Sequence, residues 1–228
     1  MGIFEELGFK KWPGEAEAGL RPTFPPGFFK QKDTETIGDV LVPFWGPLDK
    51  IPKNRAEVYE IYGRAPKDKN HKAFNKAEMT VAKNLPGHWN SSSHKLYILG
   101  VMEEYLREAL RRCERLGVID YIDSMGSYNH RHMRYDTAMP LSYHAWGAAV
   151  DINPDSNRVK YRKAFKDVLT TPLQPFDAAW RAQYPNGVPK LLVKAFTSVG
   201  FTWGGDWGNK DFSKVNFIDP MHFELISR

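Results

Sequence analysis

The sequence contains the segment Ser142-Tyr-His144-Ala-Trp-Gly147-Ala-Ala-Val-Asp151, in which small residues separate a histidine from an aspartate. Gly147 and the small residues after it predict a close backbone turn that leads into a tightly packed strand at 148–152. Residues seven apart point to opposite faces of one strand. If His144 and Asp151 bind one metal ion, His144 must therefore lie on the turn before the strand.

A second stretch, Asp219-Pro-Met-His222-Phe-Glu224, carries the same residue types. His222 and Glu224 are two apart and share a strand face, whereas Asp219 lies in the approach to the strand. A catalytic zinc site needs three protein ligands, one open position and an unliganded carboxylate that moves protons. Asp219 has the position of a general base, and Glu224 that of a partner of the ligand histidine or of a substrate contact.

Each of these residues, taken singly, is more often a surface or hydrogen-bonded residue than a metal ligand. Together, and among their Gly, Ala and Trp neighbours, they favour a metal site. The absence of cysteine from the set disfavours a closed structural zinc site, which usually recruits thiolates.

Hydrophobic periodicity predicts an α+β domain with a small antiparallel sheet flanked by helices. Asn54 and Gly63 have the positions of helix caps, and 64–76 has the polarity of a loop. The predicted helices are 55–62, a long helix with apolar positions from Leu96 to Cys113, and 190–199; the predicted strands are 118–125, 148–152, 201–203 and 221–226.

Composition divides the chain into two predicted parts. Residues 1–50 hold 6 of the 16 prolines and 7 of the 18 glycines, which frustrate regular structure. We expect this N-terminal extension to be an arm or cover whose aromatic side chains pack on the rest. Residues 51–228 form the predicted working domain.

Charge and hydropathy narrow the class of partner. Residues 51–228 hold 26 basic and 19 acidic side chains, an excess that favours an anionic polymer such as nucleic acid or a bacterial wall. No Lys/Arg-rich block with interleaved aromatics is present, so we expect no nucleic acid. No apolar run is long enough to span a bilayer, so membrane insertion is not expected either. A monomer is favoured.

The N-terminus is acidic where a secretory signal would be basic, so we expect synthesis in the cytoplasm without a signal peptide. Cys113 is the single cysteine, which excludes an intramolecular disulfide. Its place on an apolar helix face predicts a buried hydrophobe rather than a nucleophile.

Three motifs in this sequence resemble those of the zinc D-alanyl-D-alanine carboxypeptidase and L-alanyl-D-glutamate endopeptidase family. They are Ser142-x-His144-x-x-Gly147-x-Ala149-x-Asp151, Trp203-Gly-Gly-x-Trp207 and Asp219-x-x-His222-Phe. This family includes vancomycin-resistance-type carboxypeptidases and phage endolysins. The resemblance extends from about Ile51 to the C-terminus and is strongest from Met125 onward. It implies a hedgehog/D,D-peptidase-like fold and a peptide of peptidoglycan as substrate.

The resemblance also implies roles for individual residues. His144, Asp151 and His222 would bind one zinc ion (Zn²⁺) per chain, and Asp219 would be the catalytic base. Arg131 fits the arginine that the family places before the Ser-x-His turn, where it would dock a substrate carboxylate or stabilise an oxyanion.

Other residues near these motifs have two interpretations. Ser142 is expected to hydrogen-bond to the site, because a zinc-bound histidine cannot activate it as a nucleophile. Trp203, Trp207 and Trp146 are candidates for lining a substrate groove and equally for packing in the core. His130 and His132 are expected in a solvated loop rather than at the metal.

These observations predict a zinc metallopeptidase that hydrolyses peptidoglycan peptides and acts on the bacterial cell wall, as an endolysin of a bacteriophage or a virion-associated enzyme does. Asp219, where the vancomycin-resistance branch usually has Glu, favours an endopeptidase. A D-Ala-D-Ala carboxypeptidase stays open. The alternative from another class is a non-enzymatic, zinc-containing wall-binding or virion structural module.

Overall fold

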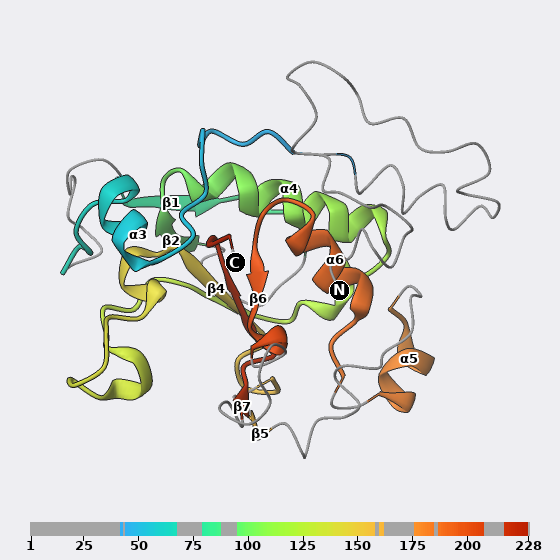
Figure 1. Cartoon of the computed structure of the whole chain (residues 1–228). Coiled ribbons are helices and arrows are strands. Elements are labelled where there is room, and N and C mark those ends of the chain that lie inside the picture. The colour runs from blue at the N-terminus through green and yellow to red at the C-terminus, as the bar shows by residue number, and fades with distance from the viewer. Residues whose placement is uncertain are drawn as a thin grey trace, which may run out of the picture.

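The computed structural model describes residues 42, 44–67, 79–87, 95–157, 160–161, 176–184, 187–207 and 217–227. Within this part of the chain, helices and short antiparallel strands confirm the predicted α+β class (Figure 1). The helices are α3 (Arg55–Ile61), α4 (Met102–Arg115), α5 (Ala178–Gln183) and α6 (Lys190–Thr197). The strands are β1 (Met79–Lys83), β2 (Lys95–Leu99), β3 (Met125–Gly126), β4 (Ala149–Ile152), β5 (Lys160–Tyr161), β6 (Thr202–Trp203), β7 (Phe217–Ile218) and β8 (His222–Glu224).

The sheet that organises the molecule has the strand order β3-β4-β8-β6, with every neighbouring pair antiparallel. In this register Asp151 of β4 lies directly opposite His222 of β8. Two residues that are 71 positions apart in the chain are thereby brought within side-chain reach of each other. Two further pairs, β1 with β2 and β5 with β7, stand apart from this sheet.

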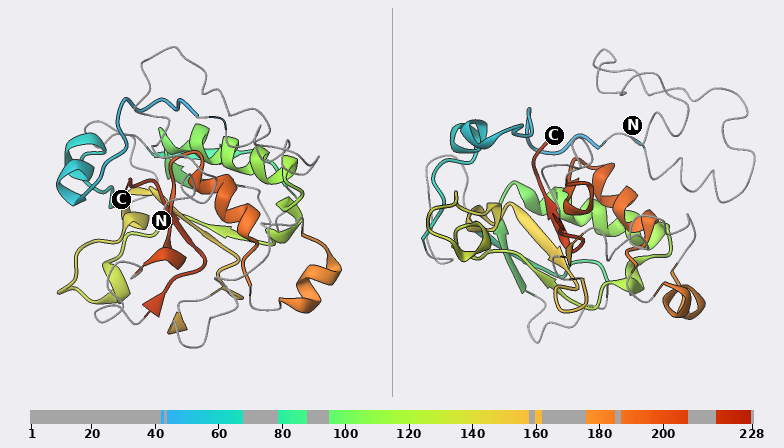
Figure 2. Two further views of the ribbon diagram at one scale, coloured as in Figure 1. Left: turned by 45° about the vertical axis from the view of Figure 1, so that its right-hand side comes forward. Right: turned by 60° about the horizontal axis from the view of Figure 1, so that its bottom comes forward.

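Helices α4 and α6 lie side by side and form the core with the sheet (Figure 2). Met102, Leu106 and Cys113 of α4 are fully buried, so the prediction of a buried Cys113 is confirmed. The Phe196 ring of α6 lies 4.5 Å from the Phe223 ring of β8. Since successive side chains of a strand alternate between faces, His222 and Glu224 point away from α6.

The segment before α3 lies on helix α4. The Phe44 ring meets the Tyr105 ring edge-on at 5.3 Å, and the Leu48 backbone N–H donates to the Tyr105 hydroxyl. A Cβ on Gly46 would collide with the same ring, so the backbone passes directly over it. Most of the predicted N-terminal extension lies outside the described residues.

Several predicted elements are confirmed: the capped helix α3, helix α6, and strands β4, β6 and β8. The prediction that Leu96 and Leu99 begin the long helix is wrong, because both lie in β2 and the helix begins at Met102. A three-residue step between apolar residues is compatible with a helix, but the pairing of β2 with β1 decides the conformation here.

The predicted strand at 118–125 is also wrong over most of its length. Residues Ile119–Tyr121 form a 3-10 turn, and only Met125–Gly126 pair as β3. The Asn153 side-chain oxygen accepts from the backbone N–H groups of Asp123 and Ser124 at 2.7 and 3.0 Å. This side chain satisfies the backbone where a neighbouring strand otherwise would.

No helix in the described ranges is long and apolar enough to cross a membrane.

Candidate metal centre

A short capped turn presents His144. The Ser142 hydroxyl accepts from the His144 backbone N–H at the start of the 3-10 helix Tyr143–Trp146. Gly147 ends this helix with φ +65°, and a Cβ there would come within 2.8 Å of the Leu99 backbone nitrogen. The Leu99 N–H donates to the Gly147 carbonyl at 3.0 Å, which fixes the turn against β2. The prediction that His144 lies on the turn before the strand is confirmed.

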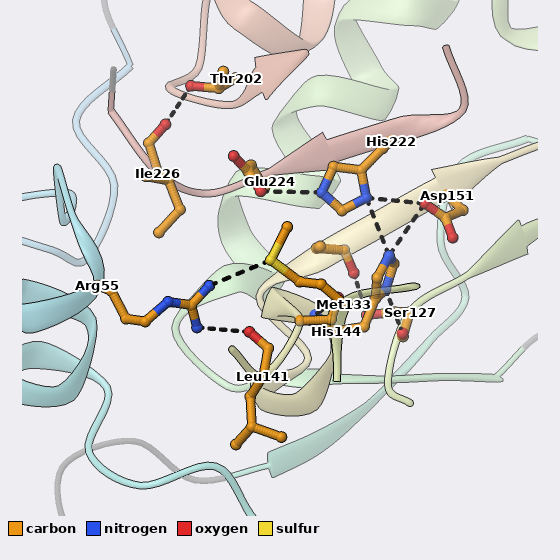
Figure 3. A network of polar contacts seen from close by, with 12 residues as sticks. Arg55, Ser127, Met133, Leu141, His144, Asp151, Thr202, His222, Glu224 and Ile226 are labelled. Atoms are coloured by element: carbon orange, nitrogen blue, oxygen red, sulfur yellow. Dashed lines mark hydrogen bonds and ion pairs between the residues drawn. The ribbon is translucent and has the colours of Figure 1, made fainter. Parts of the chain in front are cut away.

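Three side chains converge at this point (Figure 3). His144 Nε2 lies 3.2 Å from Asp151 Oδ1 and 3.1 Å from His222 Nδ1. His222 Nδ1 in turn lies 3.2 Å from Asp151 Oδ1. This cluster could hold a metal ion, and it consists of the three residues that the motif resemblance proposes as ligands.

Each histidine is oriented by a second acceptor behind it. His144 Nδ1 lies 2.7 Å from the Ser127 carbonyl oxygen, and His222 Nε2 lies 3.0 Å from Glu224 Oε2. Carbonyl and carboxylate oxygens only accept, so each of these ring nitrogens carries the hydrogen. When both rings are neutral, the opposite ring nitrogens, His144 Nε2 and His222 Nδ1, carry lone pairs that face each other and Asp151.

Three acceptor atoms this close together require a cation between them. In the absence of an ion a proton serves: burial alone would lower the pKa of His222, but its contacts with Asp151 and Glu224 raise it. Burial alone would raise the pKa of Asp151, but the hydrogen bonds and charges of the two histidines hold it well below its usual range.

The donor set fits zinc. Two imidazole nitrogens and one carboxylate oxygen are ordinary zinc ligands, with bonds of about 2.0–2.2 Å. In a tetrahedron of such bonds neighbouring ligand atoms are about 3.3–3.6 Å apart, slightly more than the 3.1–3.2 Å separations of the three donor atoms.

Asp219 lies beside this cluster as a buried carboxylate. It is 8% exposed, and its Oδ1 has no hydrogen-bond partner. Burial raises the pKa of the carboxyl to about 6, while the charges of His222 and Arg131 act in the opposite direction. Gly204 passes so close that a Cβ there would come within 2.4 Å of the Asp219 carbonyl oxygen, so this glycine lets the two segments meet.

Arg131 has an unpartnered donor as well. Its Nε is buried without a hydrogen bond, and its guanidinium lies over the Tyr135 ring, 4.8 Å from the ring centre. The face of the guanidinium is therefore used by the aromatic ring. Its in-plane N–H groups are the ones suited to a carboxylate.

The three tryptophans differ in environment. Trp146 is fully buried and donates to the Gly63 carbonyl, and Trp203 is 5% exposed and donates to the Pro220 carbonyl. Both environments favour the core-packing interpretation. The Trp207 ring lies 5.1 Å from the His222 ring, so this tryptophan lies beside the metal cluster.

The remaining sequence candidates hold the backbone. Ser142 is buried and caps the turn that carries His144. Nδ1 of His130 contacts the Pro66 carbonyl and Nδ1 of His132 contacts the Met139 carbonyl, contacts that tie loop segments together rather than contribute to the cluster. Sequence reasoning missed Ser127, because its contribution to the site is a backbone carbonyl that any residue type carries.

Fold and site together define a small α+β protein with a His-Asp-His centre of the kind found in metallopeptidases. Residues 136–225 match the family model described as D-alanyl-D-alanine carboxypeptidase, a family of zinc-dependent peptidases. The match includes the three cluster residues and Asp219, and it confirms the resemblance seen in the motifs. No curated protein and no solved structure shows a significant match to the chain.

Proposed function

We propose that this protein is a zinc peptidase that hydrolyses peptide bonds in bacterial peptidoglycan, with zinc held by His144, Asp151 and His222. One observation carries the proposal. Three lone-pair donors, each fixed by its own outer contact or strand register, converge within 3.2 Å inside the segment that matches the peptidase family.

A zinc ion held there would supply a Lewis acid for the scissile carbonyl and would make a water molecule more acidic. Asp219 is the proposed base that takes the proton of the attacking water. Burial of the Asp219 carboxyl raises its pKa, which favours taking up this proton and then returning it to the leaving amine. Its unpartnered Oδ1 is the atom available for this transfer.

Arg131 is proposed to bind the substrate on the Asp219 side of the cluster. Its charge opposes the rise that burial causes in the pKa of Asp219, so the two groups are electrostatically coupled. The buried Nε without a partner would donate a hydrogen bond to a substrate carboxylate or to the developing oxyanion.

The other residues have proposed supporting roles. Trp207 lines the substrate groove beside His222, and Ser142 supports the site through the turn that it caps. Glu224, which is 1% exposed, holds the His222 ring rather than meeting substrate. Trp203 supports the Asp219 segment from the core side through its bond to Pro220.

At a coarser level, we propose that residues 51–228 form the peptidase domain, with a hedgehog/D,D-peptidase-like fold, and that residues 1–50 form an extension. We propose that the protein acts as a monomer on the cell wall in an endolysin-like setting. Asp219, where the vancomycin-resistance branch usually has Glu, supports an endopeptidase over a carboxypeptidase.

The test is digestion of purified peptidoglycan. Zinc-loaded protein is expected to release free amino groups, a chelator to stop the release, and added zinc to restore it. Mass spectrometry of the products identifies the bond: an internal cut of the stem or cross-link peptide for an endopeptidase, loss of a terminal D-alanine for a carboxypeptidase. A protein that binds one zinc ion and sediments with the walls but releases nothing would instead be a wall-binding module.

A further inference from the structure

Arg55 of α3 lies outside the family-matched segment and contacts two residues at the turn that presents His144, and a third, Met133, near Arg131. Its Nη1 donates to the Leu141 carbonyl oxygen at 2.6 Å, and its guanidinium lies over the Tyr143 ring at 4.8 Å from the ring centre. Its Nη2 lies 3.9 Å from Met133 Sδ. Figure 3 shows Arg55 reaching Leu141 and Met133.

Two of the contacted residues are immediate neighbours of site residues. Leu141 directly precedes Ser142, which caps the turn, and Tyr143 directly precedes His144. One side chain therefore contacts the residue on each side of the cap, the backbone of Leu141 and the ring of Tyr143.

The same contact extends to the segment of Arg131. Leu141 forms an isolated antiparallel bridge with His132, and the Ser142 N–H donates to the Arg131 carbonyl at 2.9 Å. A displacement of Leu141 would therefore be transmitted to the proposed substrate-binding arginine as well as to the proposed metal ligand.

Helix α3 is itself a fixed support. Val58 is fully buried, and the Tyr62 hydroxyl donates to the Leu225 carbonyl at 2.8 Å, one residue beyond β8. The Tyr59 ring packs edge-on against Trp146 of the turn at 5.3 Å. Helix α3 and its C-cap thus join the end of the strand that carries His222 to the turn that carries His144, and Arg55 is the helix residue that contacts this turn at Leu141 and Tyr143.

Only arginine can make both principal contacts at once. Its planar guanidinium donates in its plane to a carbonyl while its face stacks on an aromatic ring, whereas the lysine ammonium is a point charge that can make one of these contacts. A purely space-filling role would not need this combination.

We infer that Arg55 is a positioning residue of the metal centre, which holds the Ser142–His144 turn so that His144 Nε2 stays within reach of Asp151 and His222. The inference rests on the proposed zinc site and adds to it a residue that touches neither metal nor substrate.

The test is zinc affinity, measured by competition with a chromophoric chelator at a temperature well below the unfolding transition of every variant. Arg55→Ala is expected to bind zinc about tenfold more weakly, the lower end of the effect of removing an outer partner of a metal ligand. Arg55→Lys is expected to fall between Arg55→Ala and the unmodified protein.

Arg107→Ala is the matched control. Arg107 also donates to two backbone carbonyls, those of Lys83 and Asn84, and pairs with Glu103, yet it contacts no part of the site. Its loss is expected to leave the zinc affinity unchanged.

Failure of the unmodified protein to bind zinc would overturn the proposed function, and this inference with it. Tight zinc binding by the unmodified protein together with equal affinity in Arg55→Ala would overturn this inference alone, whatever the loss of stability. If Arg55→Ala does not fold, Arg55→Lys decides: weaker binding supports the inference, and unchanged affinity overturns it.

Discussion

Cys113 shows how burial governs a single residue. The thiol is fully buried on the inner face of α4, and burial raises its pKa well above the ordinary value of a cysteine. Since the thiolate is the reactive form, we expect no labelling by a thiol reagent at pH 8 in the folded protein and complete labelling after unfolding. Rapid labelling of the native protein would contradict the described packing of α4.

The sequence predicts the parts of the site that are made by side chains, because residue types are visible in it. The spacing His144-x₆-Asp151 and Asp219-x₂-His222-x-Glu224 predicted which side chains gather, and the structure brings the first, second and fourth of them together. The partner of His144 could not be predicted in this way, because the Ser127 carbonyl is a backbone group without a signal in residue type.

The turn between the 3-10 helix and β4 depends on Gly147. Its φ of +65° is costly for any residue with a Cβ, and the added atom would meet the backbone of β2. Gly147→Ala is expected to destabilise the protein by about 2–4 kcal/mol, the sum of the left-handed conformation and the overpacking. Urea unfolding measures this difference in the free energy of unfolding.

Gly126→Ala is the matched control in the same sheet. Gly126 lies in β3 opposite Asp151, and a Cβ there would meet nothing within 4 Å. The free energy of unfolding of Gly126→Ala is expected to stay within about 1 kcal/mol of that of the unmodified protein. Equal effects of the two substitutions would show that the Gly147 turn is not the constrained element described here.

Helices and strands can be predicted from sequence where a capping residue or a glycine marks their ends. Helix α3 begins at its Asn54 cap and stops before Gly63, as expected from residue types alone. The interval 95–99 lacks such a signal: Leu96 and Leu99 fit a helix, yet the partner strand β1 makes this interval a strand. Long-range pairing of this kind overrides local propensity.

At the scale of the whole molecule, a metal ion would join the turn and β4 to β8, whose His222 lies 71 positions after Asp151 in the chain. An ion that binds only the folded state stabilises it by RT ln(1 + [L]/Kd), about 4 kcal/mol at a free concentration 1,000 times Kd. We expect zinc to raise the melting temperature by about 8–16 °C.

Thermal unfolding with zinc and with a chelator checks this expectation. His144→Ala serves as the control, because it removes one ligand and should abolish the zinc-dependent shift. A melting temperature of the unmodified protein that zinc does not change would contradict the proposed metal site.

The global arrangement was the least predictable part. No local pattern indicates that β8 pairs with β4 and β6, and this pairing alone places His222 opposite Asp151. The motif resemblance does predict this proximity, because it implies that His144, Asp151 and His222 bind the same zinc ion. It did not include Arg55, whose role depends on where α3 packs.

We propose that Asp219 acts as the base of the reaction and does not bind the metal. The most direct test of this proposal is the rate at which Asp219→Ala, at a zinc content equal to that of the unmodified protein, releases amino groups from purified peptidoglycan. We expect one zinc ion per chain in this variant and a rate lower by about 10²–10⁴-fold, the usual contribution of a general base. An Asp219→Ala protein that hydrolyses peptidoglycan at the unmodified rate would contradict the proposal.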